Sequence, residues 1–207
     1  MASGCPRPAP YGEDRSRPDV PLQRMVYRFS VRLDAPPDWA YRWATDYRSD
    51  DTEITGDPRA RIVERLADHL VLLTDTFPSE PRDRKAGRRG VKARLVHLYP
   101  ERRYWVSQHV SGPALHSQFL YEVVPRGSRS STLLFTGSHV EEVSRTPTRA
   151  SIAARAAELR RDDLAGWRRY ARALREDRRR AQQRSKPPRG RVSTRRNARR
   201  RARARRN

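Results

Sequence analysis

The sequence of 207 residues predicts an α+β fold, in which a curved antiparallel sheet of about seven strands wraps around one long C-terminal helix. Three observations predict it. A strand with alternating apolar residues, 25–33, leads directly into a helix that starts with proline. Several strand-like segments follow, separated by short breaks, and a long helical pattern comes last. A sheet wrapped in this way usually encloses a pocket.

The first strand is predicted by strict alternation. Its apolar side chains fall on one face, and arginine and serine fall on the other; the apolar residues are Met25, Tyr27, Phe29, Val31 and Leu33. Such alternation is typical of a strand with one buried face. Asp34 is the expected cap of the next helix. Pro36 and Pro37 suit its first turn, because the N–H groups that proline lacks would have no partner within the helix there.

The middle of the chain is predicted to form a meander. A turn at 67–69 joins two strand-like segments, 61–66 and 70–77, into a hairpin, and a polar loop, 78–90, follows. Parallel crossovers need about a dozen residues, so the short breaks between strands indicate antiparallel neighbours. Four further strands are expected at 91–99, 103–110, 115–124 and 131–141.

The last helix is expected to begin at Thr146-Pro147, a cap followed by proline at the first helical position. Apolar residues recur at helical spacing as far as Leu174, and Asp163 interrupts this stripe. The pattern stops at about Asp177. We therefore predict three parts, which are a disordered proline-rich leader, a folded domain and a disordered arginine-rich tail, at 1–24, 25–177 and 178–207.

The positive charge is concentrated in the tail. The chain has a net charge of +22, and fifteen of its 46 basic residues lie in 178–207, where there is no acidic residue. Clustered cations release counterions when they neutralise phosphates, so this segment predicts non-specific binding to nucleic acid or to an anionic surface. The alternative is a solvated tail. Because 43 of the basic residues are arginine, a bias toward GC-rich codons accounts for such a tail equally well.

Several classes of protein are excluded by what the sequence lacks. Cys5 is the single cysteine, which excludes a disulfide within the chain and a cysteine metal site. Neither a secretory signal nor an apolar run of about 20 residues is present, so we expect a cytoplasmic protein without a transmembrane segment. No phosphate-binding or dinucleotide-binding glycine pattern occurs. The histidines do not have metal-ligand spacing, so no metal or cofactor is expected.

One stretch of the chain resembles a known family. Segment 27–41, with Ala35-Pro36 after the strand and Trp39 in the helix, resembles the opening of the START-like (SRPBCC) superfamily, and more narrowly its polyketide cyclase/dehydrase and lipid-transport group. Asp46-Tyr47 is similar to the exit of that group's first helix. The predicted last hairpin and closing helix are similar as well, so the resemblance covers roughly 25–177. Ser131-Thr132 departs from the group's usual Gly-Thr.

The resemblance implies a helix-grip fold with an internal cavity for a small hydrophobic or aromatic ligand, lipid-like or polyketide-like. Members of the superfamily include cyclases, hydrolases, lipid carriers and binders without a known reaction. For this chain it implies ligand binding, with cyclase or dehydrase chemistry as the reaction to consider. Fold alone does not decide among these functions. A nucleic-acid-associated protein that acts through its arginine-rich tail is the alternative.

Aromatic residues on the predicted inner surfaces are the candidates for ligand binding, because cavities are mostly apolar with a few polar groups. The alternative for each of them is that it simply fills the core. The candidates are Trp43, Tyr47, Tyr99, Trp105, Tyr121, Trp167 and Tyr170.

Three residues are candidates for catalysis: His97, His109 and Asp163. The two histidines share a strand face with Tyr99 and Trp105 respectively, and a histidine suits a general base because its pKa lies near neutrality. A carboxylate of Asp163 that faced the cavity would have a raised pKa and would orient a ligand hydroxyl. The alternatives are ordinary strand histidines and an ion pair between Asp163 and a nearby arginine such as Arg160.

Overall fold

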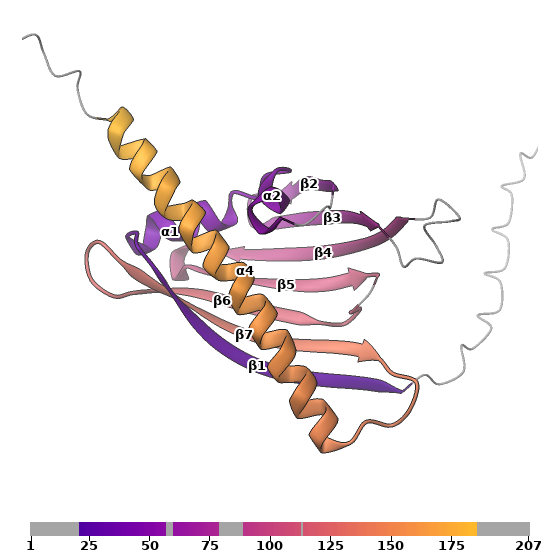
Figure 1. Ribbon diagram of the computed structural model, residues 1–207. Coiled ribbons are helices and arrows are strands. Elements are labelled where there is room, and N and C mark those ends of the chain that lie inside the picture. Colours follow the sequence, from indigo (N-terminus) through magenta and orange to yellow (C-terminus); the bar gives the residue numbers. More distant parts are fainter. Residues whose placement is uncertain (1–20, 57–59, 79–88, 113, 186–207) are drawn as a thin grey trace, which may run out of the picture.

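The computed structural model describes residues 21–56, 60–78, 89–112 and 114–185 and confirms the predicted fold. Figure 1 shows a curved sheet of seven antiparallel strands with one long helix lying across it. The elements, in chain order, are β1 (Leu22–Leu33), α1 (Pro37–Thr45), α2 (Asp51–Thr55), β2 (Ala60–Ala67), β3 (Leu70–Pro78), β4 (Arg89–Tyr99), η1 (Pro100–Arg102), β5 (Tyr104–Ser111), β6 (Gln118–Pro125), β7 (Ser131–Glu142) and α4 (Arg149–Arg184).

The strands are arranged in the order β1-β7-β6-β5-β4-β3-β2. Strands β2 to β7 pair with their neighbours in the sequence, as short connections require. Strand β1 instead pairs with β7, with Phe29 opposite Phe135. Helix α4 packs mainly on β1 and crosses the concave face of the sheet diagonally (Figure 1). The cavity described below lies between this face and the helices.

The core lies on the concave face, where the alternation of β1 places its apolar side chains as predicted. Phe29 stacks on Phe135 with ring centroids 4.4 Å apart, and Phe119 continues the row at 5.9 Å from Phe135. Gly137 makes room for this row. A Cβ atom at that position would lie 2.9 Å from the Phe135 ring and 3.0 Å from the Tyr27 ring. Real Cβ atoms rarely lie so close to another heavy atom.

Two helix starts differ from the prediction. The N-cap of α1 is Pro36, without a side-chain capping bond, whereas Asp34 forms ion pairs with Arg32 and Arg175. Helix α4 begins after Thr148, whose hydroxyl accepts a hydrogen bond from the Ser151 N–H at 3.1 Å, two residues later than Thr146. A hydroxyl that reaches a free N–H of the first turn defines a helix start better than a following proline does.

The described elements extend beyond the predicted domain at both ends. Strand β1 begins at Leu22 rather than Met25, and α4 continues to Arg184. Residues 178–184 are therefore helical and not a disordered tail, and Arg178 donates to the carbonyl oxygens of Asp34 and Arg129. Residues 1–20 and 186–207, and 79–88 of the predicted loop, lie outside the described residues. None of the helices in the described ranges is both long and apolar enough to cross a membrane.

Strand β6 begins at Gln118 and not at the predicted residue 115. Ala114 and His116 have φ angles of 63° and 68°, which lie in the left-handed region and are incompatible with a strand. This turn aligns β6 with β5, so that Trp105 lies opposite Tyr121. Both side chains then point to the concave face.

Candidate ligand cavity

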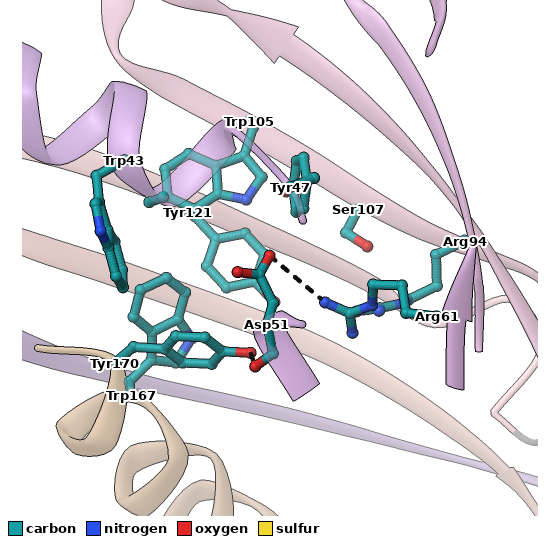
Figure 2. Close-up of a pocket in the computed structure, with 11 residues that line it drawn as sticks. Trp43, Tyr47, Asp51, Arg61, Arg94, Trp105, Ser107, Tyr121, Trp167 and Tyr170 are labelled. Carbon is teal, nitrogen blue, oxygen red and sulfur yellow. Dashed lines mark hydrogen bonds and ion pairs between the residues drawn. The ribbon is translucent and has the colours of Figure 1, made fainter. Parts of the chain in front are cut away.

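A cavity of about 110 Å³ lies between the concave face of the sheet and helices α1, α2 and α4. Figure 2 shows its aromatic side chains together on one side and its two arginines on the other. The lining combines residues from seven helices and strands and from the turn at Tyr47, which the curvature of the sheet brings together. These residues are Trp43, Ala44, Tyr47, Asp51, Arg61, Arg94, Trp105, Ser107, Tyr121, Trp167 and Tyr170.

The aromatic side of the cavity is built around a stacked pair. The Trp105 and Tyr121 rings are 4.9 Å apart and nearly parallel, at 8°. Trp167 of α4 lies 5.5 Å from Tyr121, and Tyr170 lies 5.3 Å from Trp167. The Trp43 indole N–H donates to Asp177 at 3.0 Å, which fixes its ring beside α4. These rings form an apolar wall against which a flat aromatic group packs favourably.

Tyr47 reaches the cavity through an unusual backbone conformation. Its φ angle is 39°, in the left-handed region, just after the end of α1 at Thr45. A non-glycine residue in this region is uncommon, and such strain is concentrated at functional sites. The turn redirects the chain from α1 to α2, which brings Asp51 to the opposite side of the cavity from the sheet.

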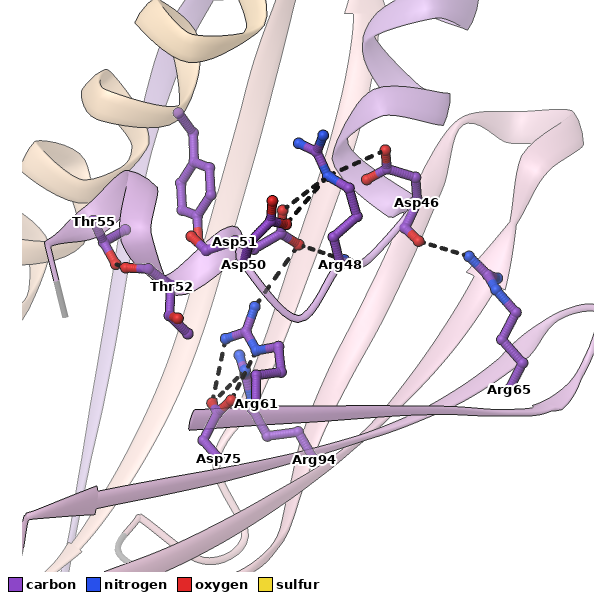
Figure 3. A network of polar contacts seen from close by, with 11 residues as sticks. Asp46, Arg48, Asp50, Asp51, Thr52, Thr55, Arg61, Arg65, Asp75 and Arg94 are labelled. Carbon is purple, nitrogen blue, oxygen red and sulfur yellow. Dashed lines mark hydrogen bonds and ion pairs between the residues drawn. The ribbon is translucent and has the colours of Figure 1, made fainter. Parts of the chain in front are cut away.

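The polar side of the cavity is organised by Asp75 of β3, which is 0% exposed. Asp75 accepts a hydrogen bond from Arg61 Nε and another from Arg94 Nη2, both at 2.7 Å (Figure 3). Burial raises the pKa of Asp75, but the Arg61 hydrogen bond and the Arg94 charge outweigh it and hold the pKa below its ordinary value. Asp51 also approaches Arg61, at 3.9 Å. Two guanidinium groups are thereby fixed at one end of the cavity.

Two polar atoms of the lining lack a hydrogen-bond partner within the described part of the chain: Arg94 Nε and Ser107 Oγ. Both atoms are buried, and Ser107 is 3% exposed. Their residues lie on the concave face of the neighbouring strands β4 and β5. Buried polar groups in proteins nearly always have a partner. The arrangement therefore suits a bound acceptor oxygen, supplied by a ligand or by water.

The tyrosines of the lining remain neutral at ordinary pH. Burial raises the pKa of Tyr47, Tyr121 and Tyr170, and the nearby arginines only partly oppose this effect. The Tyr170 hydroxyl donates to the Asp51 carbonyl oxygen at 3.3 Å. These phenols are hydrogen-bond donors and weak acids, rather than bases, in any chemistry of the cavity.

Six of the seven aromatic residues named from the sequence line the cavity, and their role in binding stays a prediction. They are Trp43, Tyr47, Trp105, Tyr121, Trp167 and Tyr170.

The prediction that Tyr99 and His97 face inward is wrong. Tyr99 is 42% exposed and stacks on Tyr104, with ring centroids 4.4 Å apart. The buried positions of β4 are Val96 and Leu98, so the alternation of the strand turns His97 to the convex face.

His109 is buried and Asp163 is half-buried near the concave face, and neither belongs to the lining of this cavity. The His109 ring packs 5.1 Å from the Phe119 ring. Asp163 accepts a hydrogen bond from the Tyr27 hydroxyl at 2.5 Å. The alternative partner, Arg160, donates instead to the Arg28 carbonyl oxygen. Among the described residues, no three histidine, cysteine or acidic side chains are grouped closely enough to hold a metal ion.

Replacing Asp163 with asparagine is expected to change how stability depends on pH. Burial raises the pKa of Asp163, and the hydrogen bond from Tyr27 lowers it by a smaller amount, so the pKa stays above its ordinary value. A carboxyl group with a raised pKa in the folded state loses stabilising effect as the pH rises from its unfolded pKa, about 3.9, through its folded pKa. Asp163→Asn should therefore gain stability relative to the wild type across this window, measured by urea unfolding at several pH values.

The control for this experiment is Asp162→Asn, because Asp162 is the preceding residue on α4 and its side chain is 66% exposed. A difference between Asp163→Asn and the wild type that stays constant with pH, or that matches the difference seen for Asp162→Asn, would contradict the assignment.

The sequence interpretation missed the polar residues of the cavity: Asp51, Arg61, Arg94 and Ser107. A signal for part of this set was present. Asp75 follows Val71 and Leu73 on the inward face of a strand that is otherwise apolar. An acid at such a position requires a buried cation. Arg61 lies directly opposite Asp75 in the hairpin, so the predicted turn at 67–69 indicates this partner.

Comparison with known proteins shows similarity in structure only. No family model and no curated protein sequence matches the chain. An aromatase/cyclase from Streptomyces sp. R1128 has a TM-score of 0.57 at 14% identity, covering 73% of this chain and 94% of that chain. A START superfamily protein from Mycobacterium smegmatis has a TM-score of 0.53 at 14% identity, and the match covers 72% of this chain and 98% of that chain.

One further similar structure is a di-domain ARO/CYC from the steffimycin biosynthetic pathway, with a TM-score of 0.55 at 14% identity. The match covers 75% of this chain and 52% of that chain. At these identities the comparisons show the fold: the chain has the START-like, helix-grip fold that its sequence predicts.

Proposed function

We propose that the protein binds a small oxygenated aromatic molecule, of the polyketide-like class, in the cavity between the sheet and α4. The ring packs on the Trp105–Tyr121 wall, and an acceptor oxygen receives hydrogen bonds from Arg94 and Ser107. The observation that carries this proposal is the pair of unpartnered buried polar atoms at one end of an aromatic cavity. The similar fold of an aromatase/cyclase supports it.

The size and lining of the cavity favour one oxygenated ring over a lipid. The volume of about 110 Å³ is below the range of about 300–1,000 Å³ that holds drug-sized ligands. An apolar cavity of about 150 Å³ holds benzene, so a cavity of about 110 Å³ has room for no more than one ring. An acyl chain would leave the hydrogen-bonding groups of Arg94 and Ser107 unsatisfied, whereas a carbonyl or carboxylate oxygen satisfies them.

The finer proposal is cyclisation and dehydration within the part of a poly-β-ketone that enters the cavity, so that a single ring closes there. Asp51, the carboxylate of the lining, accepts a proton from a carbon between two carbonyls, and Arg94 stabilises the enolate oxygen. The enolate carbon then bonds to a carbonyl carbon, whose oxygen takes up the proton. Loss of that hydroxyl and a second α-proton as water forms the double bond. His97 does not take part, because it lies on the convex face of β4, on the other side of the sheet from the cavity.

Binding is tested with three single-ring probes of similar size: benzoate, acetophenone and ethylbenzene. We expect benzoate and acetophenone to bind more tightly than ethylbenzene, which has no acceptor oxygen. Ser107→Ala should weaken the first two by roughly 2- to 12-fold, the equivalent of one hydrogen bond, and leave ethylbenzene unchanged. Isothermal titration calorimetry measures the three affinities.

Ser30→Ala is the matched control, because Ser30 lies on the exposed face of β1. Equal affinities for all three probes, or equal effects of the two serine substitutions, would contradict the polar subsite. Failure of every probe to bind would contradict the cavity as a ligand site.

As a second readout, a synthetic poly-β-ketone thioester is incubated with the protein. Loss of water no faster than in buffer would rule out the catalytic step and leave binding intact.

A further inference from the structure

Four arginines form a straight line along the exposed face of α4. Helical residues turn by about 100° each, so positions separated by 7, 11 and 18 residues return to within about 20° of one another. Arg161, Arg168, Arg172 and Arg179 have this spacing, and all four are exposed. We call them the α4 stripe. Its ends are about 27 Å apart at 1.5 Å per residue.

Several arginines on other sides of α4 take part in the fold. Arg155 forms ion pairs with Glu141 and Glu158, and Arg178 donates to the carbonyl oxygens of Asp34 and Arg129. The stripe differs from them. Arg161 approaches its neighbour Asp162 at 3.7 Å, with both side chains exposed. For the other three members, the described part of the chain provides no hydrogen bond or ion pair.

The spacing of the stripe does not favour helix stability. Arg168 and Arg172 are four residues apart, where like charges repel and an acid–base pair would stabilise the helix. Glu176 is the one acid close to the C-terminal half of the stripe, at its margin. The stripe therefore brings together cations whose charge the fold does not use, which is the arrangement expected of a surface for an anionic partner.

We propose that the α4 stripe docks on the phosphate backbone of duplex nucleic acid. A duplex carries one negative charge per about 1.7 Å of its axis, both strands counted, so a stretch of duplex as long as the stripe carries about sixteen phosphate charges. A membrane surface fits less well, because a helix that lies in the interface needs large apolar residues beside its basic ones. The only apolar residue within the stripe is Ala165. Contacts of this kind position a protein without reading sequence.

The C-terminal end of α4 adds reach to this surface. Every residue from Arg179 to Ser185 is exposed, and Figure 1 shows the helix continuing past the sheet at that end. A duplex can therefore lie along the stripe without meeting the sheet. The docking does not involve the cavity, so it stands or fails independently of ligand binding.

The test uses the full chain and a 20-base-pair duplex of arbitrary sequence, with binding followed by fluorescence anisotropy over a range of salt concentrations. The stripe variant replaces its four arginines with glutamine. The control variant replaces four exposed arginines elsewhere, Arg42, Arg102, Arg126 and Arg145, and has the same net charge. Each phosphate contact contributes about 0.9 to the slope of log affinity against log salt. We expect the stripe variant to lose about 3 from this slope, and the control less than about 1.

Circular dichroism and thermal melting establish that both variants are folded. Equal losses in the two variants would overturn the proposal, because net charge alone would then account for binding. An unchanged stripe variant would also overturn it and assign binding to other basic residues. The same proteins are titrated with vesicles of one part phosphatidylserine to three parts phosphatidylcholine. Loss of vesicle binding without loss of duplex binding in the stripe variant would identify a membrane surface instead.

Discussion

Replacing Asp75 with alanine is expected to lower the free energy of unfolding by about 3–5 kcal/mol, as for other broken buried ion pairs. The carboxylate holds Arg61 and Arg94 through hydrogen bonds of 2.7 Å, and it is completely buried. Its removal leaves two cations in the interior with one remaining acid, Asp51, at 3.9 Å from Arg61. Asp51 then offsets only part of the desolvation cost of the two charges, and Arg94 keeps no acid partner among the described residues.

Urea unfolding measures this effect, and Asp38→Ala is the matched control. Asp38 pairs with Arg103 at 3.0 Å, but its side chain is 71% exposed. Exposed pairs contribute about 0–1 kcal/mol, so the control should lose no more than that. A loss below about 1 kcal/mol for Asp75→Ala would show that Arg61 and Arg94 rearrange into solvent, and would remove the physical basis of the polar end.

The same carboxylate has a defined pH signature. The pKa of Asp75 is held below its ordinary value in the folded protein. Its contribution to stability is therefore complete above the unfolded pKa, near 3.9, and is lost as the pH falls through the folded pKa. Below that range, Asp75→Ala and the wild type should differ less than at neutral pH. The free energies of unfolding of the two proteins are compared by urea unfolding at pH 7 and at the lowest pH where the wild type remains folded.

The inward positions of most strands could be predicted from alternation alone, and strand β4 shows where this fails. Most of its odd positions are apolar, among them Val91, Leu95 and Tyr99, whereas the even positions include Lys92 and Arg94. Counting apolar residues therefore favours the odd face. The structure has the even face inside, because Arg94 is neutralised by Asp75 of the next strand. A buried ion pair reverses the apparent polarity of a strand face.

The candidate site was predictable to the extent that aromatic residues recur at inward positions. Trp105 shares one face of β5 with Ser107 and His109, and Tyr121 shares one face of β6 with Phe119 and Val123. The two strands are neighbours in the meander, so the contact between Trp105 and Tyr121 follows from the strand order. The position of Tyr47 could not be predicted in this way, because it depends on a left-handed backbone conformation that no local sequence pattern indicates. The pairing of Asp75 with Arg94 depends on the register of β3 with β4, across a segment that the sequence marks only as a loop.

Replacing Trp105 with alanine is the second substitution with a large expected effect, about 3–5 kcal/mol of unfolding free energy. Trp105 is 2% exposed and stacks on Tyr121 at 4.9 Å. Its ring also packs against Tyr41 at 5.9 Å and Trp167 at 6.2 Å. Alanine removes the ring from all three contacts. Urea unfolding followed by circular dichroism measures the loss, and a loss under about 1 kcal/mol would contradict this packing.

Val106→Ala is the control, because Val106 is the next residue on β5 and points to the convex face. Stability alone does not separate a ring that fills the core from a ring that forms the wall of a ligand site. Trp105→Phe does so, because phenylalanine keeps an aromatic ring at the position but covers less of Tyr121. If the wall contacts a ligand, the affinity for acetophenone falls along with stability. A ring that only fills the core lowers stability and leaves that affinity unchanged.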